Sequence, residues 1–329
     1  MPNLILTTKC NLDCSYCFGR DVMQKGGNKI ADMSMEIFHE LKAWIIRERQ
    51  KITSVHLMGG EPTLNHNLVE MACSLLDEGL AVSIFSNCST SESPVCAQWL
   101  KDKNVTWVVN VNPPESRTAQ QDSFLRESLE TLGEAVVITL NILPQQMDYE
   151  WTLDLIAQYG LARKIKIGFV LPTLSKTNEY LSDEDYPVVA ERVVEFARLC
   201  NRFDVKLEYE CGVPWCSFTT EQLGALWACN SSFFSSCDSR LDILPDGRVI
   251  YCLPLAELCS VAYSNFYSYR EAKKWFEGSL SPYRPLGSKT ECPSCRLMIQ
   301  GPCRGGCLAR TLSGAKNIEI GGRTISNVS

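Results

Sequence analysis

The chain has 329 residues, of which 45% are hydrophobic and 21% charged, a composition typical of a globular protein large enough for a full core. A formal charge of −6 without any basic run excludes nucleic acid and anionic membranes as primary partners. The sequence shows neither the roughly 20 consecutive apolar residues of a membrane span nor a signal-peptide pattern, so we expect a cytoplasmic protein.

Residues 1–205 alternate between apolar, β-branched runs and helical patterns. The predicted strands cover 4–8, 55–58, 81–85, 105–111, 135–142 and 165–171, and the predicted helices cover 34–49, 68–78, 92–103, 123–132, 151–159 and 183–201. Six units of this kind predict an α/β fold, a partial (β/α)6 TIM-like barrel of parallel strands with outer helices. Because such barrels carry their chemistry at the carboxyl ends of the strands, motifs directly after strands matter most.

Residues 206–329 predict a second domain, a small cysteine-rich α+β extension. Strands at 241–244 and 248–252 flank Pro245-Asp246-Gly247, a turn signal, and predict a hairpin. A short helix is expected at 269–276, and the tail after Arg310 is polar and weakly patterned.

Seventeen cysteines are the most informative part of the composition. Their odd number, in a chain without an export signal, argues against a disulfide framework. Three lie at 10–17 and ten lie after residue 205, and clustering of this kind indicates metal binding.

The first cluster, Cys10-x3-Cys14-x2-Cys17, follows the first predicted strand. Three thiolates on one loop can bind three irons of a cubane cluster and leave the fourth iron open for a chelating ligand. Zinc usually takes four protein ligands, so a compact group of three suits it poorly. The alternatives are a zinc loop or three unrelated thiols.

A second motif, Met58-Gly59-Gly60-Glu61-Pro62-Thr63, follows the second predicted strand. Two glycines allow the backbone to approach a ligand closely, and a carboxylate beside them suits an ammonium group. Alone it could be a simple strand-to-helix turn.

Together the two motifs resemble the radical S-adenosylmethionine (radical SAM) superfamily over roughly residues 1–205. The resemblance implies that Cys10, Cys14 and Cys17 hold a [4Fe–4S] cluster whose open iron is chelated by SAM. It also implies SAM contacts for residues that end the strands or flank the cluster. These residues are Tyr16 near the adenine, Gly59, Gly60 and Glu61 at the methionine amine, Ser86 and Asn87 near the carboxylate or ribose, and Asn110, Asn112 and Asn141 toward the ribose or substrate.

The C-terminal cysteines resemble the SPASM extension of such enzymes, which carries auxiliary iron–sulfur clusters. The spacing Cys237-x9-Gly247-x4-Cys252 fits that family, whereas Cys292-x2-Cys295-x7-Cys303-x3-Cys307 has a longer middle gap than usual.

The family's crossed pattern implies that one auxiliary cluster uses Cys237, Cys252, Cys307 and one upstream cysteine. Cys229 is the preferred fourth ligand, followed by Cys216 and Cys211. The other cluster would use Cys292, Cys295 and Cys303, but the usual downstream cysteine does not follow Cys307. Its fourth position is left open between a non-cysteine ligand, an open iron and an out-of-order cysteine such as Cys259, and the cluster could also be absent.

The remaining cysteines at 73, 88, 96 and 200 fall in or beside α/β elements and are expected to be small buried hydrophobic side chains. Lys9 and Arg20 are read as solvated or cluster-facing charges rather than catalytic groups. Structural zinc is the alternative for the C-terminal cysteines, because paired C-x2-C and C-x3-C spacings also bind zinc.

The resemblance implies that an external donor such as flavodoxin or ferredoxin reduces the cluster, and that a 5′-deoxyadenosyl radical then abstracts hydrogen from the substrate. A ribosomally made peptide or protein is the first substrate class, with crosslinking, epimerisation or oxidation as the outcome. Only nine residues precede Cys10, so leader binding would need a separate protein or the barrel surface. A small-molecule dehydrogenase or rearrangement enzyme is the second reading, and a zinc-stabilised binding module is the alternative outside enzymology.

Overall fold

The structure is a computed structural model that describes residues 1–23, 32–47, 52–145, 148–229, 231–238, 240–315, 317–321 and 323–326. The end of the first predicted helix, residues 48–49, lies outside this part of the chain.

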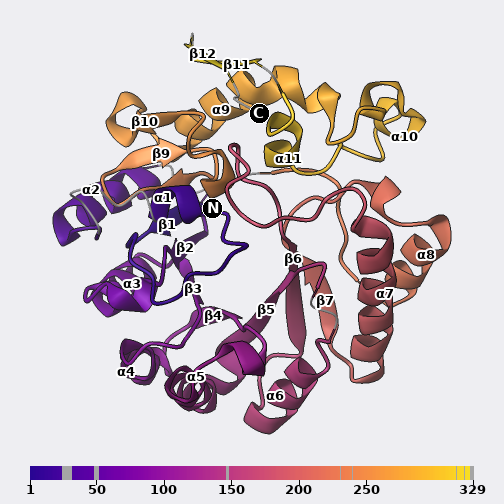
Figure 1. The fold of residues 1–329 in the computed structure, drawn as a ribbon. Coiled ribbons are helices and arrows are strands. Elements are labelled where there is room, and N and C mark those ends of the chain that lie inside the picture. Colours follow the sequence, from indigo (N-terminus) through magenta and orange to yellow (C-terminus); the bar gives the residue numbers. More distant parts are fainter. Residues whose placement is uncertain are drawn as a thin grey trace.

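One open sheet of ten strands, in the order β10-β9-β8-β1-β2-β3-β4-β5-β6-β7, curves into a partial barrel (Figure 1). The strands of the parallel portion are β1 (Asn3–Ile5), β2 (Ser54–Met58), β3 (Ala81–Ser86), β4 (Val105–Asn110), β5 (Val136–Ile142), β6 (Lys164–Phe169) and β7 (Lys206–Tyr209). The sheet confirms the predicted α/β partial barrel and all six of its predicted strands. Strand β7 is an addition, because its alternation of charged and apolar residues is too short to predict a strand.

Helices cover the outside of the barrel, as the alternating pattern requires. They are α2 (Met35–Ile46), α3 (Leu68–Asp77), α4 (Glu92–Leu100), α5 (Ala119–Leu132), α6 (Trp151–Tyr159), α7 (Tyr186–Arg202) and α8 (Thr220–Ala228), with the single turn α1 (Arg20–Met23) after β1. Helix α5 begins four residues before the predicted start, since Thr118 and Gln121 form a capping box ahead of a polar first turn.

The predicted hairpin is present as β8 (Asp242–Ile243) and β9 (Arg248–Ile250), followed by β10 (Ser260–Ala262). Strand β8 also pairs in parallel with β1, so the barrel sheet continues across residue 205 into the cysteine-rich region. The division at residue 205 therefore separates two sequence patterns but does not separate two sheets.

The rest of this region is mainly helical. It contains α9 (Tyr269–Leu280), α10 (Arg296–Ile299), α11 (Leu308–Leu312) and a second sheet of β11 (Asn317–Ile320) and β12 (Arg323–Ser326). Helix α9 confirms the helix expected at 269–276, and the weakly patterned tail contains α11 and the β11–β12 pair.

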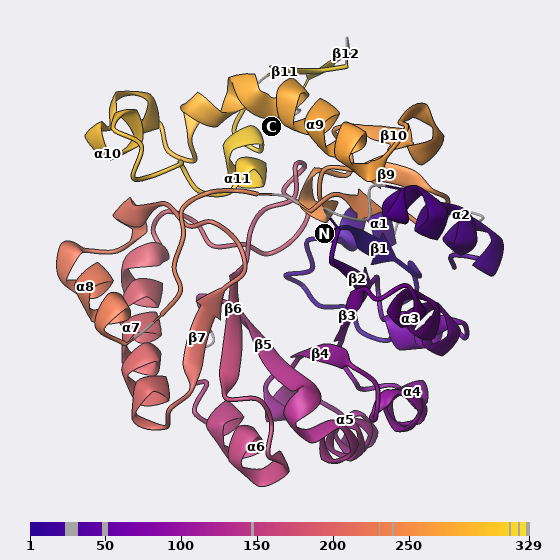
Figure 2. The same ribbon diagram turned by 180° about the vertical axis from the view of Figure 1, so that it is seen from behind.

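The C-terminal region lies across the open side of the barrel in both views (Figures 1 and 2). At one end, the indole of Trp44 on α2 donates a hydrogen bond of 2.9 Å to the carbonyl of Phe266. At the other end, Arg310 on α11 donates to the carbonyl of Leu181 at 2.7 Å and pairs with Asp183. The cysteine-rich region therefore contacts the barrel from α2 at one end to the segment before α7 at the other. No helix in the described ranges has the length and apolarity of a membrane span.

Candidate active site

The loop between β1 and α1 carries Cys10, Cys14 and Cys17 on one short path. The amide of Cys17 donates to the carbonyl of Cys14 at 3.1 Å, which turns the loop back on itself. Loss of hydration raises the pKa of the Cys10 thiol to about 12, with smaller contributions from the nearby Glu61, Cys14 and Cys17. Burial also raises the pKa of Cys17. The three thiols are therefore near enough to interact electrostatically, and a metal that binds them must displace their protons.

The two glycines after β2 hold this loop in place. The amide of Gly60 donates to the carbonyl of Thr7 at 2.9 Å, and the amide of Glu61 donates to that of Lys9 at 2.8 Å. A Cβ at Gly59 would lie 2.5 Å from the Thr7 oxygen, and one at Gly60 would lie 2.1 Å from the Lys9 oxygen. Only glycine allows this approach, so the Gly-Gly motif fixes the backbone directly before Cys10.

Glu61 is fully buried, and its carboxylate joins the ends of two strands. Oε1 accepts hydrogen bonds from the Thr63 amide at 3.1 Å, the Thr63 hydroxyl at 2.8 Å and the Ser86 hydroxyl at 2.7 Å. Oε2 accepts from the Asn87 amide at 2.7 Å. Burial raises the pKa of Glu61 against the lowering effect of these bonds. Because a carboxylate has about four acceptor positions, the first role of Glu61 in this structure is to place Ser86 and Asn87.

A row of polar side chains runs from the cysteine loop across the next strand ends. The amide of Asn112 lies 3.8 Å from the Cys14 sulfur, and the Tyr16 hydroxyl donates to Asn112 at 2.5 Å. Asn110 donates to the Tyr16 oxygen at 3.3 Å, and Asn141 donates to Asn110 at 2.7 Å. The three asparagines predicted to line the site are therefore connected to the cysteine loop through Tyr16.

Asn87 reaches the same loop from β3. Its side-chain amide donates to Asn11 at 2.9 Å, and Asn11 donates to the Ser89 hydroxyl at 2.9 Å. A small hollow lies beside these side chains, lined among others by Leu12, Asn87, Asn110 and Asn112. Asn11 was not predicted as a site residue from the sequence, although its position inside the Cys-x3-Cys loop gives it access to the site.

The two charges flanking the cysteine loop are both paired. Lys9 lies 2.6 Å from Asp32, and Arg20 lies 3.0 Å from Asp13. These contacts fit the interpretation of Lys9 and Arg20 as peripheral charges.

A second polar pair lies beyond Asn141 and joins Lys166, within β6, to Glu210, which directly follows β7. Lys166 Nζ is 3.7 Å from Glu210 Oε1, and both side chains are partly exposed. Gly168 separates them from the polar row, since a Cβ there would lie 3.1 Å from Asn141 Oδ1 and 3.8 Å from Glu210 Oε2. Loss of hydration raises the pKa of the Glu210 carboxyl, while the positive charges of Lys166 and Arg240 lower it. The pair was missed because the barrel was predicted to end before β7.

Four C-terminal cysteines form one group next to this pair. Cys307 forms a sulfur hydrogen bond with Cys237, and it also interacts electrostatically with Cys211 and Cys252. The bond lowers the pKa of Cys237 and raises that of Cys307. Cys211 directly follows Glu210 and interacts with it and with Cys237.

The structure changes the choice of the upstream cysteine in this group. Cys229 is the C-cap of α8, and it interacts electrostatically with Cys200 and Tyr209. Cys211, the last of the three candidates, is the one that joins Cys237, Cys252 and Cys307. Its position depends on β7, which the sequence did not predict; these contacts favour Cys211 over Cys229, and the ligand assignment itself stays a prediction.

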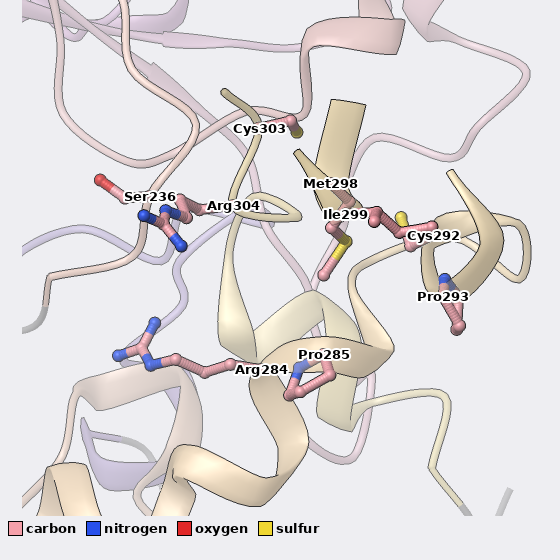
Figure 3. A pocket seen from close by; sticks show the side chains of 9 residues that line it. All are labelled: Ser236, Arg284, Pro285, Cys292, Pro293, Met298, Ile299, Cys303 and Arg304. Atoms are coloured by element: carbon pink, nitrogen blue, oxygen red, sulfur yellow. The ribbon is translucent and has the colours of Figure 1, made fainter. Parts of the chain in front are cut away.

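The second C-terminal group contains Cys292, Cys295 and Cys303. Gly287 lies so close that its Cβ would be 2.6 Å from the Cys292 sulfur, and the amide of Gly305 donates to the Cys303 sulfur at 3.4 Å. A cavity of about 480 Å³ adjoins this group, with Cys292 and Cys303 in its wall (Figure 3). Arg284 and Arg304 line the cavity on the opposite side from Cys292.

No three His, Cys, Asp or Glu side chains of the described part of the chain converge closely enough to hold one metal ion. Ligands of a cubane cluster stand farther apart, because the irons and sulfides lie between them. The three cysteine groups thus have wider spacing than a single zinc ion needs. Cys88, Cys96 and Cys200 are buried, as expected for core cysteines, and Cys73 is half-buried.

The fold and these groups define a class of protein: a partial barrel of parallel strands with a three-cysteine loop after its first strand. Comparison with known families identifies the class further, because residues 4–167 match the family model "Radical SAM superfamily". The chain belongs to the radical SAM superfamily of enzymes.

One curated relative, named "Putative glycyl-radical enzyme activating enzyme", comes from Methanocaldococcus jannaschii and is 31% identical over 85 residues. The match covers 25% of this chain and 30% of that protein, so it spans less than a third of the relative's length.

Two solved proteins share the fold over most of the chain. Streptococcus suis SuiB bound to S-adenosylmethionine has a TM-score of 0.62 at 13% identity, covering 93% of this chain and 72% of that chain. The anSMEcpe protein with bound AdoMet has a TM-score of 0.63 at 16% identity, covering 97% of this chain and 90% of that chain. Other structures of these proteins hold the precursor peptide SuiA and the Cp18Cys peptide.

Proposed function

We propose that this enzyme cleaves SAM reductively and modifies a ribosomally made peptide or protein side chain by hydrogen abstraction. The observation that carries the proposal is the hydrogen-bonded row of polar side chains at the strand ends, which runs from the cysteine loop to Asn141. The Lys166–Glu210 pair lies on the other side of Gly168 from Asn141, and Cys211 of the auxiliary cysteine group directly follows Glu210. A substrate held along these side chains lies between a radical source and an electron acceptor.

The triad loop has the properties that a [4Fe–4S] cluster with an open iron requires. Cys10, Cys14 and Cys17 supply three thiolates, and the wall of Gly59 and Gly60 fixes the loop that carries them. With SAM bound, the cluster would supply the electron that yields a 5′-deoxyadenosyl radical. Asn112 donates toward the Cys14 sulfur, and such bonds tune a cluster's electronics.

The chain's own part in the reaction is to bind and orient. Gly59, Gly60 and the strand end placed by Glu61 form the cradle for SAM. Asn87, Asn110 and Asn112 line the adjoining hollow with donors and acceptors suited to a ribose. Placement matters because the target C–H must lie within contact distance of the reacting carbon, and small displacements slow such a step strongly.

The Lys166–Glu210 pair supplies opposite charges on the substrate side of the barrel. Because both side chains are partly exposed, they can form hydrogen bonds with the main chain or side chains of a bound peptide. The peptides held by SuiB and anSMEcpe, whose folds this chain shares, support the peptide class over a small molecule.

At least one auxiliary [4Fe–4S] cluster, held by Cys211, Cys237, Cys252 and Cys307, completes the proposal. Four thiolates leave no open iron, which suits electron transfer rather than substrate binding. Arg284 supports the site, since it donates to the Cys237 carbonyl at 2.8 Å and to the Tyr251 hydroxyl at 2.7 Å. All seventeen cysteines are unpaired in the structure, which supports a reducing cytoplasmic setting with a flavodoxin or ferredoxin as donor.

Anaerobic incubation with SAM, a reductant and candidate peptides encoded beside the gene tests the proposal by mass spectrometry. We expect 5′-deoxyadenosine together with a peptide that has lost two hydrogens, or that has gained one deuterium in heavy water. The matched control is the variant in which Cys10, Cys14 and Cys17 are alanine. Turnover of a small molecule with no peptide modified would contradict the peptide class and leave the radical chemistry intact.

A further inference from the structure

Cys216 lies beside the second C-terminal cysteine group, although the sequence offers it only as an alternative for the first. Its thiol interacts electrostatically with Lys289 and then with Cys292, Cys303 and Cys295. The side chain is exposed, so it is not packed away as a core cysteine. Cys216 is therefore a neighbour of this group, although it comes from a distant stretch of sequence.

Backbone contacts independent of any side-chain charge bring Cys216 there. It sits in a single helical turn, Trp215–Ser217, that follows Pro214. Gly306, with φ at +81°, packs on Pro214 so closely that a Cβ would lie 2.7 Å from its Cδ. This contact fixes the turn against the segment between Cys303 and Cys307.

The same stretch is tied down at its other end. A Cβ at Gly212 would lie 2.4 Å from the Ser236 carbonyl oxygen, and the amide of Val213 donates to the carbonyl of Phe234 at 3.2 Å. The segment 211–216 is thus held between 234–236 and 303–307. Cys211 faces the first cysteine group and Cys216 faces the second.

The segment from Cys303 to Cys307 has the same property. Cys307 belongs to the first group and Cys303 to the second. Two short segments, in contact at Pro214 and Gly306, therefore each present one thiol to each group.

We propose that Cys216 is the fourth thiolate ligand of a second auxiliary [4Fe–4S] cluster held by Cys292, Cys295 and Cys303. The inference rests on the proposed function, since it requires that the C-terminal region carries iron–sulfur clusters. The segment 211–216 then supplies one ligand to each cluster and sets the distance between them.

Complete thiolate ligation has a chemical consequence for this site. A cluster without an open iron cannot bind substrate through iron, so the second site serves electron transfer. Lys289 beside it is a positive charge that favours the reduced, more negative cluster and raises its reduction potential. The adjacent cavity then remains available to a donor or a substrate group without iron coordination.

The test uses the full-length chain in the background that lacks Cys10, Cys14 and Cys17, reconstituted anaerobically with ⁵⁷Fe and sulfide. This background isolates the C-terminal sites and should bind about eight irons per chain. Cys216→Ala is compared with Cys259→Ala, which removes the out-of-order cysteine proposed from the sequence. We expect Cys259→Ala to keep about eight irons.

Cys216→Ala should fall to about four irons, or hold a second cluster that releases one iron on mild ferricyanide oxidation. In that oxidation the [4Fe–4S]²⁺ cluster releases one Fe²⁺ into solution and transfers one electron to ferricyanide. The [3Fe–4S]⁺ cluster that remains is detected by EPR. Cys216→Ser gives an independent readout, because one iron should then show an oxygen ligand in its Mössbauer spectrum.

Iron content, oxidation behaviour and Mössbauer spectra that match Cys259→Ala in both Cys216 variants would overturn the proposal. A parent variant that holds only about four irons, or zinc, would instead contradict the second auxiliary cluster itself. The two failures are distinguishable, because the first appears only on changing Cys216 and the second appears before any change to it.

Discussion

The N-terminal cysteine loop and the C-terminal cysteine region bring their thiols together in different ways. At the N-terminus, three thiols lie on eight consecutive residues, and two glycines one strand away fix their backbone. In the C-terminal region, the thiols of each group come from several segments that pack together only in the folded chain. The first arrangement is local and is readable in sequence, whereas the second depends on which loops meet.

Replacing Cys10, Cys14 and Cys17 by alanine should give the largest effect, complete loss of 5′-deoxyadenosine formation. The physical reason is that no other described thiols lie on that loop to hold the SAM-binding cluster. Production of 5′-deoxyadenosine is measured by liquid chromatography after anaerobic incubation with SAM and reductant. Retained far-ultraviolet circular dichroism and retained C-terminal iron are the controls. SAM cleavage at the normal rate in this variant would contradict the assignment of the SAM-binding cluster to the N-terminal loop.

The second prediction separates Cys211 from Cys229 within the C-terminal region. In the background without the N-terminal triad, Cys211→Ala should lose about four irons, because it removes one of four ligands from the first auxiliary group. Cys229→Ala is the matched control and should keep its iron, since Cys229 packs beside Cys200 and Tyr209. Iron and sulfide analysis checks both variants, and the reverse result would restore the sequence-based choice of Cys229.

The third prediction concerns Glu61, which belongs to the N-terminal site but acts through packing. In Glu61→Gln an amide N–H faces a hydrogen-bond donor, and a lost buried bond costs about 1–3 kcal/mol. The melting temperature should fall even without SAM, and SAM affinity should fall roughly 10- to 100-fold as Ser86 and Asn87 shift. Calorimetry of unfolding and of SAM binding measures the two effects.

Two alternative outcomes sharpen the role of Glu61. Weaker SAM binding with unchanged melting would show that the carboxylate acts on the ligand's ammonium group. Unchanged values for both would contradict any role in the site.

The prediction with the smallest expected effect on catalysis is a pH dependence of stability from His56 on β2. Burial, together with the charges of Arg240, Lys166 and the amino terminus, lowers the pKa of His56 to about 3. An unfolded histidine titrates near 6.5, so the unfolded chain binds this proton first as the pH falls. His56 therefore lowers stability as the pH drops from about 6.5 toward 3, by up to about 1.4 kcal/mol per pH unit.

Comparing urea unfolding of the wild type and His56→Leu at about pH 7 and about pH 5 isolates this term. The wild type should lose more stability than the variant over that interval, because carboxylates titrate alike in both. Parallel losses in the two proteins would show that His56 is not held neutral in the barrel.

The sequence alone determined the class of fold, the cysteine triad and the Gly-Gly-Glu motif. Strand periodicity and turn residues are local signals, and the triad and the motif each lie within a few residues directly after a strand. The same locality made it possible to predict Ser86, Asn110 and Asn141 as residues at strand ends.

Only the tertiary structure decided which residues complete the sites. Strand β7 was too short to predict, so Lys166 and Glu210 could not be paired and Cys211 could not be assigned. The positions of Cys216 and Cys229 depend on Gly306 packing against Pro214 and on where α8 ends. These contacts join residues that are far apart in sequence, and no periodicity or spacing encodes how two such segments meet.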